Sequence, residues 1–511
     1  MVRRADERRT AKGLGATRTR GDFLKIAAGG ALLTLGVLSG CEADPRIRAT
    51  ASPARAGQTW AFRSRPDLKP PPVEVIRSAG GTAPGYVFAA AKNGPGEEHV
   101  AQDGPMILDN EGLPVWLRPV RDQTEDAMDF KAQRYKGESV LTWWQGVHGG
   151  WGQGEYLIFD ASYREVARVR AGNGYDGDHH EFLISERNTA LFTIYHGVPM
   201  DLSPFGGPKD GTVMDGIAQE VDIETGEVLF EWHSLEHVGF EESTSAPVPD
   251  LEDAYDYFHI NSVEFDHDGN LLVGSRKTST IYKISRGTGE VIWRLGGERS
   301  DFAMGEGARF AFQHDARRLA DGTISLFDNR GLDAGELSRG VVLELDEGSM
   351  EATLVREYTH PDRPFTPYQA SVQHLPNGNA FVGWGNAPYL TEHGPNGELL
   401  FDARFPREVE SYRAFRFPWE GWPKDRPAVA AEAGPEDRVT LYASWNGATG
   451  VDAWEVMAGP ETDRLEPLGS VSRKGFETAI ALTTDEPFVA VRATDRAGRV
   501  MGISRVVRRG G

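Results

Sequence analysis

Two stretches of this 511-residue chain place a histidine at the same point of the same pattern. His259 and His314 each precede an Asp-Gly pair, at residues 268–269 and 321–322, and each pair is followed by an apolar run. Asp-Gly between apolar runs predicts a hairpin, because glycine accepts the positive φ that a tight turn requires. The two histidines are therefore expected at equivalent points of two sheet units. Imidazoles that converge in this way could bind an anion, hold a metal or transfer a proton.

The same unit of strand, turn and strand recurs along most of the chain. Its openings fall near residues 85, 130, 180, 259, 314 and 371. Several short strands repeated every few tens of residues predict an all-β fold, a six-bladed β-propeller over residues 73–420. A pair of β-sandwiches is the competing architecture, and we favour it less because a Gly-Glu turn followed by an apolar and aromatic strand recurs in register.

The repeat stops after Pro418. Residues 427–511 contain five or more short strands of alternating polarity, which predict a C-terminal β-sandwich of the fibronectin type III or immunoglobulin-like kind.

Five histidines begin or precede a unit of the repeat. They are His179, His180, His259, His314 and His374. Because the innermost strands of a propeller all point at one axis, residues placed alike in successive blades converge on a central site. For His180, His259 and His314 this placement favours a functional role. For His374 a structural role is equally open, since its Gln-His phrase lacks the Asp-Asn ending of the unit that contains His314.

The N-terminal segment predicts export and lipid anchoring. Basic residues precede an apolar run over 26–38, which is short for a membrane span, and Cys41 follows at once. Residues 1–41 are therefore expected to be a lipoprotein-type signal peptide with Cys41 as the lipidated residue, anchoring the exported chain to the outer face of the cytoplasmic membrane. Gly21 replaces the second arginine of a twin-arginine motif, so the Sec and twin-arginine routes both stay open. Residues 42–72, rich in proline, are expected to be a tether.

The charge and cysteine content exclude several function classes. The formal net charge is −21, and outside residues 1–40 the chain has 47 basic and 73 acidic residues. Such a chain repels phosphate backbones, so we expect no nucleic-acid partner. Cys41 is the single cysteine, so the chain has no internal disulfide.

Four phrases together resemble the bacterial and fungal branch of the arylsulfotransferase family over about residues 85–405. They are the segment 103–112, the Asp-His-His-Glu-Phe phrase at 178–182, His259-Ile-Asn261-Ser with Ser275-Arg276, and Gln313-His314 with Phe327-Asp-Asn329. The resemblance implies a six-bladed propeller that moves a sulfuryl group from an aryl sulfate donor to a phenolic acceptor without a nucleotide sulfate.

The resemblance also implies roles for individual residues. His314 matches the histidine that is transiently sulfated, and Arg276 matches the sulfate-binding arginine. His259 and Asn261 match a His-x-Asn pair, and His180 matches a further active-site histidine, with His179 as the alternative. We therefore expect His314, His259, His180 and Arg276 to be catalytic, and Asn261, His179 and His374 to bind substrate. No metal and no cofactor are expected. Well-known members have an N-terminal sandwich, so the oligomeric state does not carry over.

The residue types fit this chemistry independently of the resemblance. A neutral imidazole can attack sulfur and split one transfer into two easier steps, which predicts ping-pong kinetics. A guanidinium and imidazoles can stabilise the charge that develops on the sulfuryl oxygens.

Two other readings remain at this point. The chain could be a lipid-anchored propeller that binds an anionic or cell-wall ligand without catalysis. A quinone-dependent dehydrogenase is less favoured, because its calcium carboxylates and larger repeat number are not found. Trp143, Trp144 and Trp151 could stack an aryl substrate near the axis, although packing within the blades explains them equally well.

Overall fold

In the computed structural model the described part of the chain consists mainly of β-strands. The described residues are 47–51, 55–56, 59–94, 96, 99–122, 124–249, 253–331 and 337–510. The predicted signal peptide and Cys41 lie outside them. Among the described residues, no helix has both the length and the apolar character needed to cross a bilayer.

The prediction of an all-β fold is confirmed. Strands dominate the chain, and the described helices are a single turn of α-helix, α1 (Ser234–His237), and two 3-10 turns, η1 (Ser203–Phe205) and η2 (Phe240–Glu242). Antiparallel pairing between consecutive strands explains this, because short alternating runs separated by Gly turns form hairpins with the nearest neighbour in sequence.

Six antiparallel sheets, which we call blades 1 to 6, account for most strands in the described part of the chain. Blade 1 contains β29 (Val409–Phe417), β5 (Tyr86–Asn93), β6 (Gly104–Leu108) and β7 (Pro114–Leu117). Blade 2 contains β8 (Asp126–Tyr135), β9 (Glu138–His148), β10 (Gly152–Phe159) and β11 (Glu165–Val169). Blade 3 contains β12 (Phe182–Ile184), β13 (Thr189–Met200), β14 (Gly211–Asp222) and β15 (Val228–His233).

The remaining blades follow in chain order. Blade 4 contains β16 (Ile260–Phe265), β17 (Leu271–Ser275), β18 (Thr280–Ile284) and β19 (Val291–Gly296). Blade 5 contains β21 (His314–Arg318), β22 (Ile324–Asp328), β23 (Arg339–Asp346) and β24 (Glu351–Tyr358), with β20 (Ala303–Met304) added in parallel. Blade 6 contains β25 (Ser371–His374), β26 (Ala380–Gly383), β27 (Tyr389–His393), β28 (Leu399–Arg404) and β4 (Glu74–Ser78).

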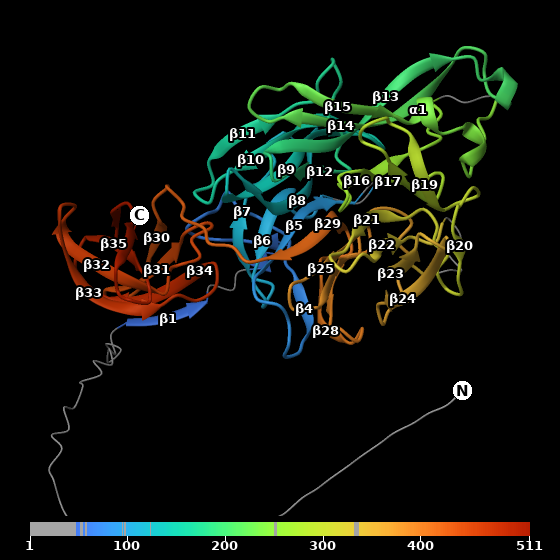
Figure 1. The fold of residues 1–511 in the computed structure, drawn as a ribbon. Coiled ribbons are helices and arrows are strands. Elements are labelled where there is room, and N and C mark those ends of the chain that lie inside the picture. Colours follow the sequence, from blue (N-terminus) through green and yellow to red (C-terminus); the bar gives the residue numbers. More distant parts are fainter. Residues whose placement is uncertain are drawn as a thin grey trace, which may run out of the picture. The chain divides into compact units, whose positions relative to one another are not determined.

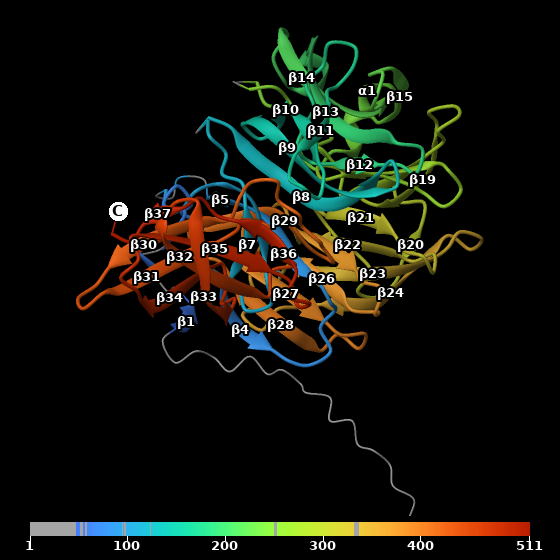
Figure 2. The same cartoon turned by 90° about the vertical axis from the view of Figure 1, so that its left-hand side faces the viewer.

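The blades form a closed ring, visible in Figures 1 and 2. Neighbouring blades contact each other mainly through their inner strands: β8 lies against β12, β16 against β21, and β21 against β25. Blade 3 meets the inner strand of blade 4 through its second strand, β13, which lies against β16. The ring closes where β25 contacts β29 and β29 contacts β8. The first strand of each blade therefore lies nearest the common axis, which is the arrangement of a β-propeller.

The innermost strand of blade 1 comes from the far end of the repeat. The unit predicted to open near residue 85 begins instead with the second strand of its blade, β5, and the inner strand is β29. The two pair antiparallel over Tyr86–Asn93 and Val409–Phe417. In the same way β4 completes the outer edge of blade 6 by pairing with β28. Exchanging strands between the two ends hides sheet edges that would otherwise stay open.

Irregularities interrupt four of the inner strands at the same level. The pairing register shifts at Met128/Lys131 in β8, Ile260/Ser262 in β16, His314/Arg317 in β21 and Ser411/Ala414 in β29. Two of the residues within these shifts, Asp129 and Asp315, have positive φ of 55° and 57°. A bulge re-aims a side chain out of the alternating pattern. Polar side chains of all four strands are buried at these points.

The C-terminal strands form two further sheets around their own core. One sheet contains β1 (Ile47–Ala51), β34 (Glu477–Thr483), β31 (Arg438–Ser444) and β30 (Ala428–Ala433). The other contains β33 (Arg464–Ser472), β32 (Ala453–Glu461), β35 (Phe488–Thr494) and β36 (Val500–Ile503), with β37 (Val507–Arg508) on β35. Buried Leu441, Trp454, Ile480 and Val491 belong to one hydrophobic cluster. Two sheets around one cluster make a layered β-structure.

Part of the segment expected to be a tether is built into the fold. Ile47–Ala51 forms β1 and pairs with β34, as both ribbon views show. Beyond the small hairpin of β2 (Arg55–Ala56) and β3 (Thr59–Trp60), Phe62 and Leu68 are buried. Phe62 lies 4.4 Å from Phe476 between ring centroids. The expectation of a tether rested on proline content, whereas Phe62 and Leu68 pack in one cluster with apolar residues of blades 1 and 6 and with Phe476.

Candidate active site

His314 is held in one tautomer by its hydrogen bonds. It is the first residue of β21, is buried, and has its Nδ1 2.8 Å from Oδ1 of Asn329. The Asn329 amide nitrogen donates to the carbonyl oxygens of Thr366 and Gln369, at 2.7 and 3.1 Å, so the amide oxygen is the atom that faces His314. Nδ1 must then be the protonated nitrogen. Nε2 is left with its lone pair, and it accepts the backbone N–H of Gln369 at 3.2 Å.

The surroundings of His314 keep its imidazole neutral. Burial, followed by the positive charge of Arg276, lowers the pKa of His314 well below its usual value, and the hydrogen bond to Asn329 opposes this only in part. A neutral imidazole with an unprotonated Nε2 is a nucleophile at neutral pH.

Two further histidines lie close to each other, each with its own carboxylate. The ring centroids of His180 and His259 are 5.0 Å apart. Nδ1 of His180 lies 2.6 Å from Asp178, and Nδ1 of His259 lies 2.5 Å from Asp256. A carboxylate at Nδ1 orients the ring and stabilises its protonated form, so each Nε2 is available for proton transfer. His259 has a positive φ of 55°, a strained conformation of the kind that concentrates at functional sites.

The charge states of Asp178 and Asp256 depend on their burial and on the histidines beside them. Burial raises the pKa of Asp178, but His180 and His179 outweigh it and lower the pKa well below its usual value. Burial also raises the pKa of Asp256, but His259 outweighs burial and lowers this pKa overall. Burial lowers the pKa of His180. Both carboxylates are therefore ionised at neutral pH and can support a histidine that takes up a proton.

Arg276 contributes a cation beside these histidines. It follows β17, and its backbone N–H donates to the carbonyl oxygen of His259 at 2.9 Å. The guanidinium lies 4.8 Å from the ring centroid of Phe312 and donates to the carbonyl oxygen of Pro367 at 3.1 Å. Its Nε is buried and has no hydrogen-bond partner within the described chain. A largely buried guanidinium with a free donor suits a tetrahedral anion.

Asn261 lies behind the nucleophile. Its amide nitrogen donates to the carbonyl oxygen of Gln313, the residue before His314, at 2.7 Å, and the side chain is fully buried. This contact fits a positioning role for Asn261. Its Oδ1 has no hydrogen-bond partner among the residues described.

His179 joins the cluster, but His374 does not. The His179 ring lies 4.0 Å from that of His180 and 4.6 Å from that of His148. Burial, then His180, lowers the pKa of His179 to about 4. His374 is the last residue of β25, opposite Ala380, and its ring contacts Tyr358.

The expectation that His374 binds substrate at the axis is therefore not supported by its position. His314 opens its inner strand, whereas His374 closes its own, so the two Gln-His phrases occupy different levels of the ring. The first residue of β25 is Ser371.

Several residues of the cluster were not predicted. The three histidines are oriented by Asp178, Asp256 and Asn329. The ring centroid of Tyr195 lies 5.5 Å from that of His180 and 5.6 Å from that of His259. An acidic residue one to three positions before a histidine was the available signal for Asp178 and Asp256. Tyr195 lies on the second strand of blade 3, and no local pattern distinguishes it.

The group Asp178, His179 and His180 also has the composition of a metal site, with candidate ligand atoms within 4.8 Å of one another. However, both oxygens of Asp178 are already used. Oδ1 accepts the backbone N–H of Gly152 at 2.6 Å, and Oδ2 accepts the N–H of His180 and the hydroxyl of Thr193. The donor set thus fits a carboxylate that orients histidine better than it fits a metal ligand.

The trio of predicted tryptophans separates into two groups. Trp143 and Trp144 are fully buried and belong to the cores around blade 2. Trp151 is partly buried and stacks with Tyr195 at 6.3 Å and 15°. Of the three, Trp151 is therefore the one next to the histidine cluster.

A buried set of charges, the axial ion network, supports the site from within the ring. It consists of Asp129, Lys131, Glu181, Asp315, Arg317 and Arg413. Arg413 is fully buried and lies 3.1 Å from both Asp129 and Glu181. It also donates to the carbonyl oxygen of Asn261 at 3.1 Å.

These ion pairs link inner strands that are far apart in sequence. Arg317 reaches Glu181 at 2.5 Å, and Asp315 accepts the backbone N–H of Val372 at 2.8 Å. Blades 1, 2, 3, 5 and 6 therefore contribute partners, and blade 4 joins through Asn261. The network fixes the level at which the histidines meet.

The fold and the site together define a β-propeller with a buried nucleophilic histidine, a guanidinium and two histidine–carboxylate pairs near its axis. The family model of arylsulfotransferase (ASST) matches residues 131–406, which is more than half of the chain. The protein belongs to this family. His180, His259, Arg276 and His314 all lie within the matched region.

Other comparisons are more distant. No curated protein matches the chain significantly. Among solved structures, a protein of unknown function from Bacteroides caccae is 14% identical, with a TM-score of 0.39, covering 65% of this chain and 98% of that one. A streptogramin B lyase is 10% identical, with a TM-score of 0.34 and coverage of 80% and 96%. A catalytically inactive virginiamycin B lyase from Staphylococcus aureus is 11% identical, with a TM-score of 0.30 and coverage of 75% and 95%.

Proposed function

We propose that this protein transfers a sulfuryl group from an aryl sulfate to a phenol through a sulfohistidine at His314. Membership of the family supports sulfotransfer between aryl groups in general. The observation that supports the histidine intermediate is the tautomer of His314: Asn329 accepts from Nδ1, so Nε2 is free of a proton.

The first half-reaction begins with attack of the Nε2 lone pair on sulfur. The N–S bond forms, the bond between sulfur and the aryl oxygen breaks, and the electron pair leaves with the phenolate. His259, paired with Asp256, gives a proton to this phenolate. The second half-reaction reverses the roles. The acceptor phenol loses its proton to His259, its oxygen attacks sulfur, and the electron pair of the N–S bond returns to Nε2. Protons and charge balance over the cycle.

His259 is assigned this proton transfer because it is the more accessible of the paired histidines. Its side chain is 15% exposed, compared with 4% for His180. Phenols therefore reach His259 more directly, while His180 lies deeper beside it.

Stabilisation of the sulfuryl oxygens falls to fixed donors. Arg276 supplies its buried Nε, which has no hydrogen-bond partner among the described residues. The backbone N–H of Gln369 donates to Nε2 of His314 before the reaction, and it passes to a sulfuryl oxygen when the Nε2 lone pair attacks sulfur. Donors that are in place before the reaction cost no reorganisation as charge develops. Removing one such donor commonly lowers kcat by roughly 10²–10³-fold.

The test uses the full chain with 4-nitrophenyl sulfate, with and without phenol. We expect nitrophenolate release that depends on phenol, and without phenol a protein adduct with the mass of one SO₃ group. His314→Ala should abolish both. His374→Ala, a histidine outside the cluster, is the matched control and should retain both. Release without an adduct in the intact protein would overturn the sulfohistidine step. Absence of release across a panel of aryl sulfates would overturn the proposed function.

We further propose that the exported chain is anchored by a lipid on Cys41. The apolar run over 26–38 that ends just before the single cysteine supports this. Labelling of expressing bacteria with a fatty-acid analogue should mark the protein and not its Cys41→Ser variant. Equal labelling of both would contradict the anchor.

A further inference from the structure

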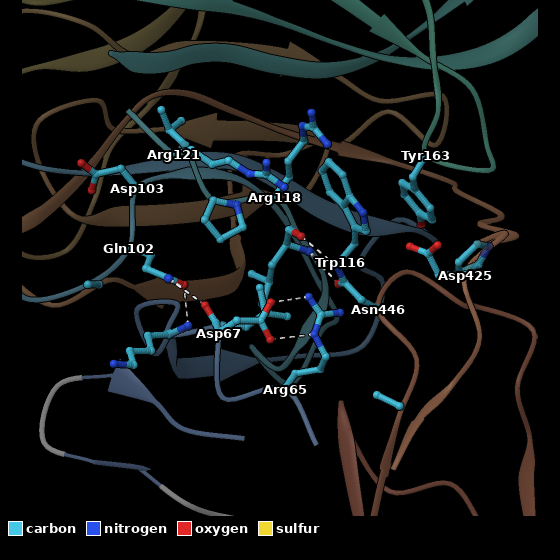
Figure 3. Close-up of a pocket in the computed structure, with 18 of the residues that line it drawn as sticks. Arg65, Asp67, Gln102, Asp103, Trp116, Arg118, Arg121, Tyr163, Asp425 and Asn446 are labelled. Atoms are coloured by element: carbon cyan, nitrogen blue, oxygen red, sulfur yellow. Dashed lines mark hydrogen bonds and ion pairs between the residues drawn. The ribbon is translucent and has the colours of Figure 1, made fainter. Parts of the chain in front are cut away.

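A large cavity lies away from the histidine cluster, between blade 1 and the C-terminal sheets. Its volume is about 1590 Å³, and its walls include residues 65–69, 116–122 and 423–426 (Figure 3). His180, His259, Arg276 and His314 do not line it. Drug-sized ligands occupy roughly 300–1,000 Å³, so this cavity has room for an extended ligand.

The walls are fixed by hydrogen bonds between blade 1 and the C-terminal sheets. The side-chain amide of Asn446 accepts the backbone N–H of Leu117 at 3.0 Å and donates to its carbonyl oxygen at 2.9 Å. Gly447 donates from its backbone to the carbonyl oxygen of Val115 at 2.8 Å. These bonds extend the edge of β7. The cavity therefore keeps its shape without a ligand.

Cationic side chains gather in the lining although the chain as a whole has a formal net charge of −21. Those without an ion pair or side-chain hydrogen bond to any described residue are Lys69, Arg118, Arg121, Arg164, Lys424 and Arg426. Arg65 differs, because it forms a two-point pair with Asp67 at 2.8 and 2.7 Å, drawn in Figure 3.

Most acidic side chains of the lining are engaged within the chain. Asp103 accepts from Asn93, Asp122 from Thr124, and Glu125 from Gln145. These hydrogen bonds leave the carboxylates charged, but the lining has seven arginine and lysine side chains against five aspartates and glutamates, so its formal charge is +2. Such a surface attracts anions by its local field.

Arg118 packs its guanidinium against two aromatic rings. Its guanidinium lies 4.5 Å from the ring centroid of Phe159 and 5.7 Å from that of Trp143. Partial burial, then the charge of Arg121, lowers the pKa of Arg118. A guanidinium stacked on rings and close to a second cation keeps its hydrogen-bond donors free for carboxylate or sulfate oxygens.

An exposed tryptophan lies next to the lining in the sequence, although it is not itself a lining residue. Trp422 is 53% exposed, directly precedes the lining residue Pro423, and is fixed by its backbone N–H bond to the carbonyl oxygen of Ala161 at 2.7 Å. A large aromatic face left in solvent is a ready surface for stacking. Sugar rings present C–H faces for such stacking, and acidic sugars add the negative charge that the arginines and lysines require.

We propose that this cavity binds an acidic oligosaccharide, with Trp422 stacking on a sugar ring and the unpaired cations holding its carboxylate or sulfate groups. The site is separate from the histidine cluster and independent of the proposed sulfotransfer. Its function is to hold the protein on an acidic glycan.

The test is calorimetric titration of the full chain with an oligogalacturonate, a chondroitin sulfate oligosaccharide, and a neutral cello-oligosaccharide of matched length. We expect one or both acidic sugars to bind and the neutral sugar not to bind. The two acidic probes distinguish carboxylate from sulfate recognition. Arg121→Gln combined with Lys424→Gln should weaken binding about tenfold, because exposed ion pairs each contribute modestly. Trp422→Ala should weaken it as well.

Arg77→Gln combined with Arg309→Gln removes the same charge from exposed sites outside the cavity and is the matched control. It should leave sugar binding unchanged. Release of nitrophenolate from 4-nitrophenyl sulfate should be unchanged in both double variants. The proposal is overturned if neither acidic sugar binds, if the two double variants weaken binding equally, or if an oligonucleotide binds as tightly as the sugars.

Discussion

At the scale of single residues, the chemistry of this protein depends on one proton being on the correct nitrogen. His314 donates from Nδ1 to Asn329, and Asn329 is oriented by two carbonyl oxygens. The Asn329 amide thus orients His314 in the way that Asp178 and Asp256 orient His180 and His259. An amide fixes the tautomer and favours the imidazolium less than a carboxylate would, which suits a nucleophile that has to stay neutral.

Replacing this amide should impair catalysis without unfolding the protein. In Asn329→Ala, the Nδ1–H of His314 keeps only the longer bond to the carbonyl oxygen of Phe312 at 3.2 Å, so the required tautomer and the orientation of the ring are held less firmly. We expect kcat for 4-nitrophenyl sulfate to fall roughly 10–100-fold, as for other residues that orient a reactive group. Asn396→Ala, in an exposed turn, is the control. Full activity in Asn329→Ala would refute the tautomer argument.

Glu264 should make stability depend on pH. Burial raises its pKa to about 7, with Arg317 acting in the opposite direction. The folded state therefore keeps a proton that the unfolded chain loses above its ordinary pKa near 4.5, so this group lowers stability as pH rises from about 4.5 to 7 and no further above that. Glu264→Gln should gain about 1–3 kcal/mol relative to wild type between pH 5 and pH 8.

Denaturant unfolding at the two pH values measures this difference. Glu290→Gln, an exposed glutamate on the rim of blade 4, should show no such gain. An equal stability difference at pH 5 and pH 8 for Glu264→Gln would contradict the raised pKa.

At the scale of elements, the inner strands are specialised by their bulges. Asp129, Asp315 and Arg413 lie within register shifts of β8, β21 and β29, and all three join the axial ion network. A regular strand would alternate these side chains between the two faces of its blade. The bulges instead turn them toward their partners on other inner strands, so secondary-structure irregularity is what assembles the network.

Arg413→Met should be strongly destabilising for this reason. It leaves the buried Asp129 and Glu181 with one cation fewer, Lys131 and Arg317 being the partners that remain, and loss of one partner of a buried pair typically costs about 3–5 kcal/mol. Arg413→Lys should recover little of the lost stability. The single ammonium group of lysine cannot replace a guanidinium that binds both carboxylates and also donates to the carbonyl oxygen of Asn261. Thermal and denaturant unfolding measure both variants. Arg187→Met removes an exposed guanidinium from the buried Glu220, which keeps Arg286 and Thr189 as partners, so it should cost below about 1 kcal/mol. Similar losses at positions 413 and 187 would exclude the network as a stabilising element.

The sequence pattern predicted the strands, and it named four residues that the structure brings together in the candidate site. His180, His259, Arg276 and His314 could be predicted because each sits beside a strand end that repeats along the chain. His374 was placed wrongly in the expected site because a repeated dipeptide does not fix its level along the strand. The network could not be foreseen, since its partners are charged residues inside strands, where polarity alone indicates solvent exposure.

At the scale of the whole molecule, ring closure depends on a strand that no local pattern identifies. β29 comes directly after β25–β28 of blade 6, and it pairs with β5, which lies more than three hundred residues earlier in the chain. Pairing of that kind leaves no turn or spacing in the sequence. The number of hairpins could be estimated from the repeat, but the exchange of strands between the two ends could not.

Truncation should reveal how much β29 contributes. A chain that ends at Glu420 keeps the whole ring, whereas a chain that ends at Glu408 lacks the inner strand of blade 1. Both lack the C-terminal sheets, so their difference isolates β29. We expect a cooperative thermal transition in near-ultraviolet circular dichroism for the longer chain and none for the shorter one. Matching transitions in the two chains would show that β29 is dispensable for closure.

The pairing of β1 with β34 has a consequence for the order of events during synthesis. The first described strand, Ile47–Ala51, finds its partner only in Glu477–Thr483. More than four hundred further residues must therefore be synthesised before β1 can form its hydrogen bonds with β34. In the same way β4 and β5 can pair with β28 and β29 only after more than three hundred further residues. The N-terminal end emerges first and is among the last parts to become native, which keeps the nascent chain open until its final strands have left the tunnel.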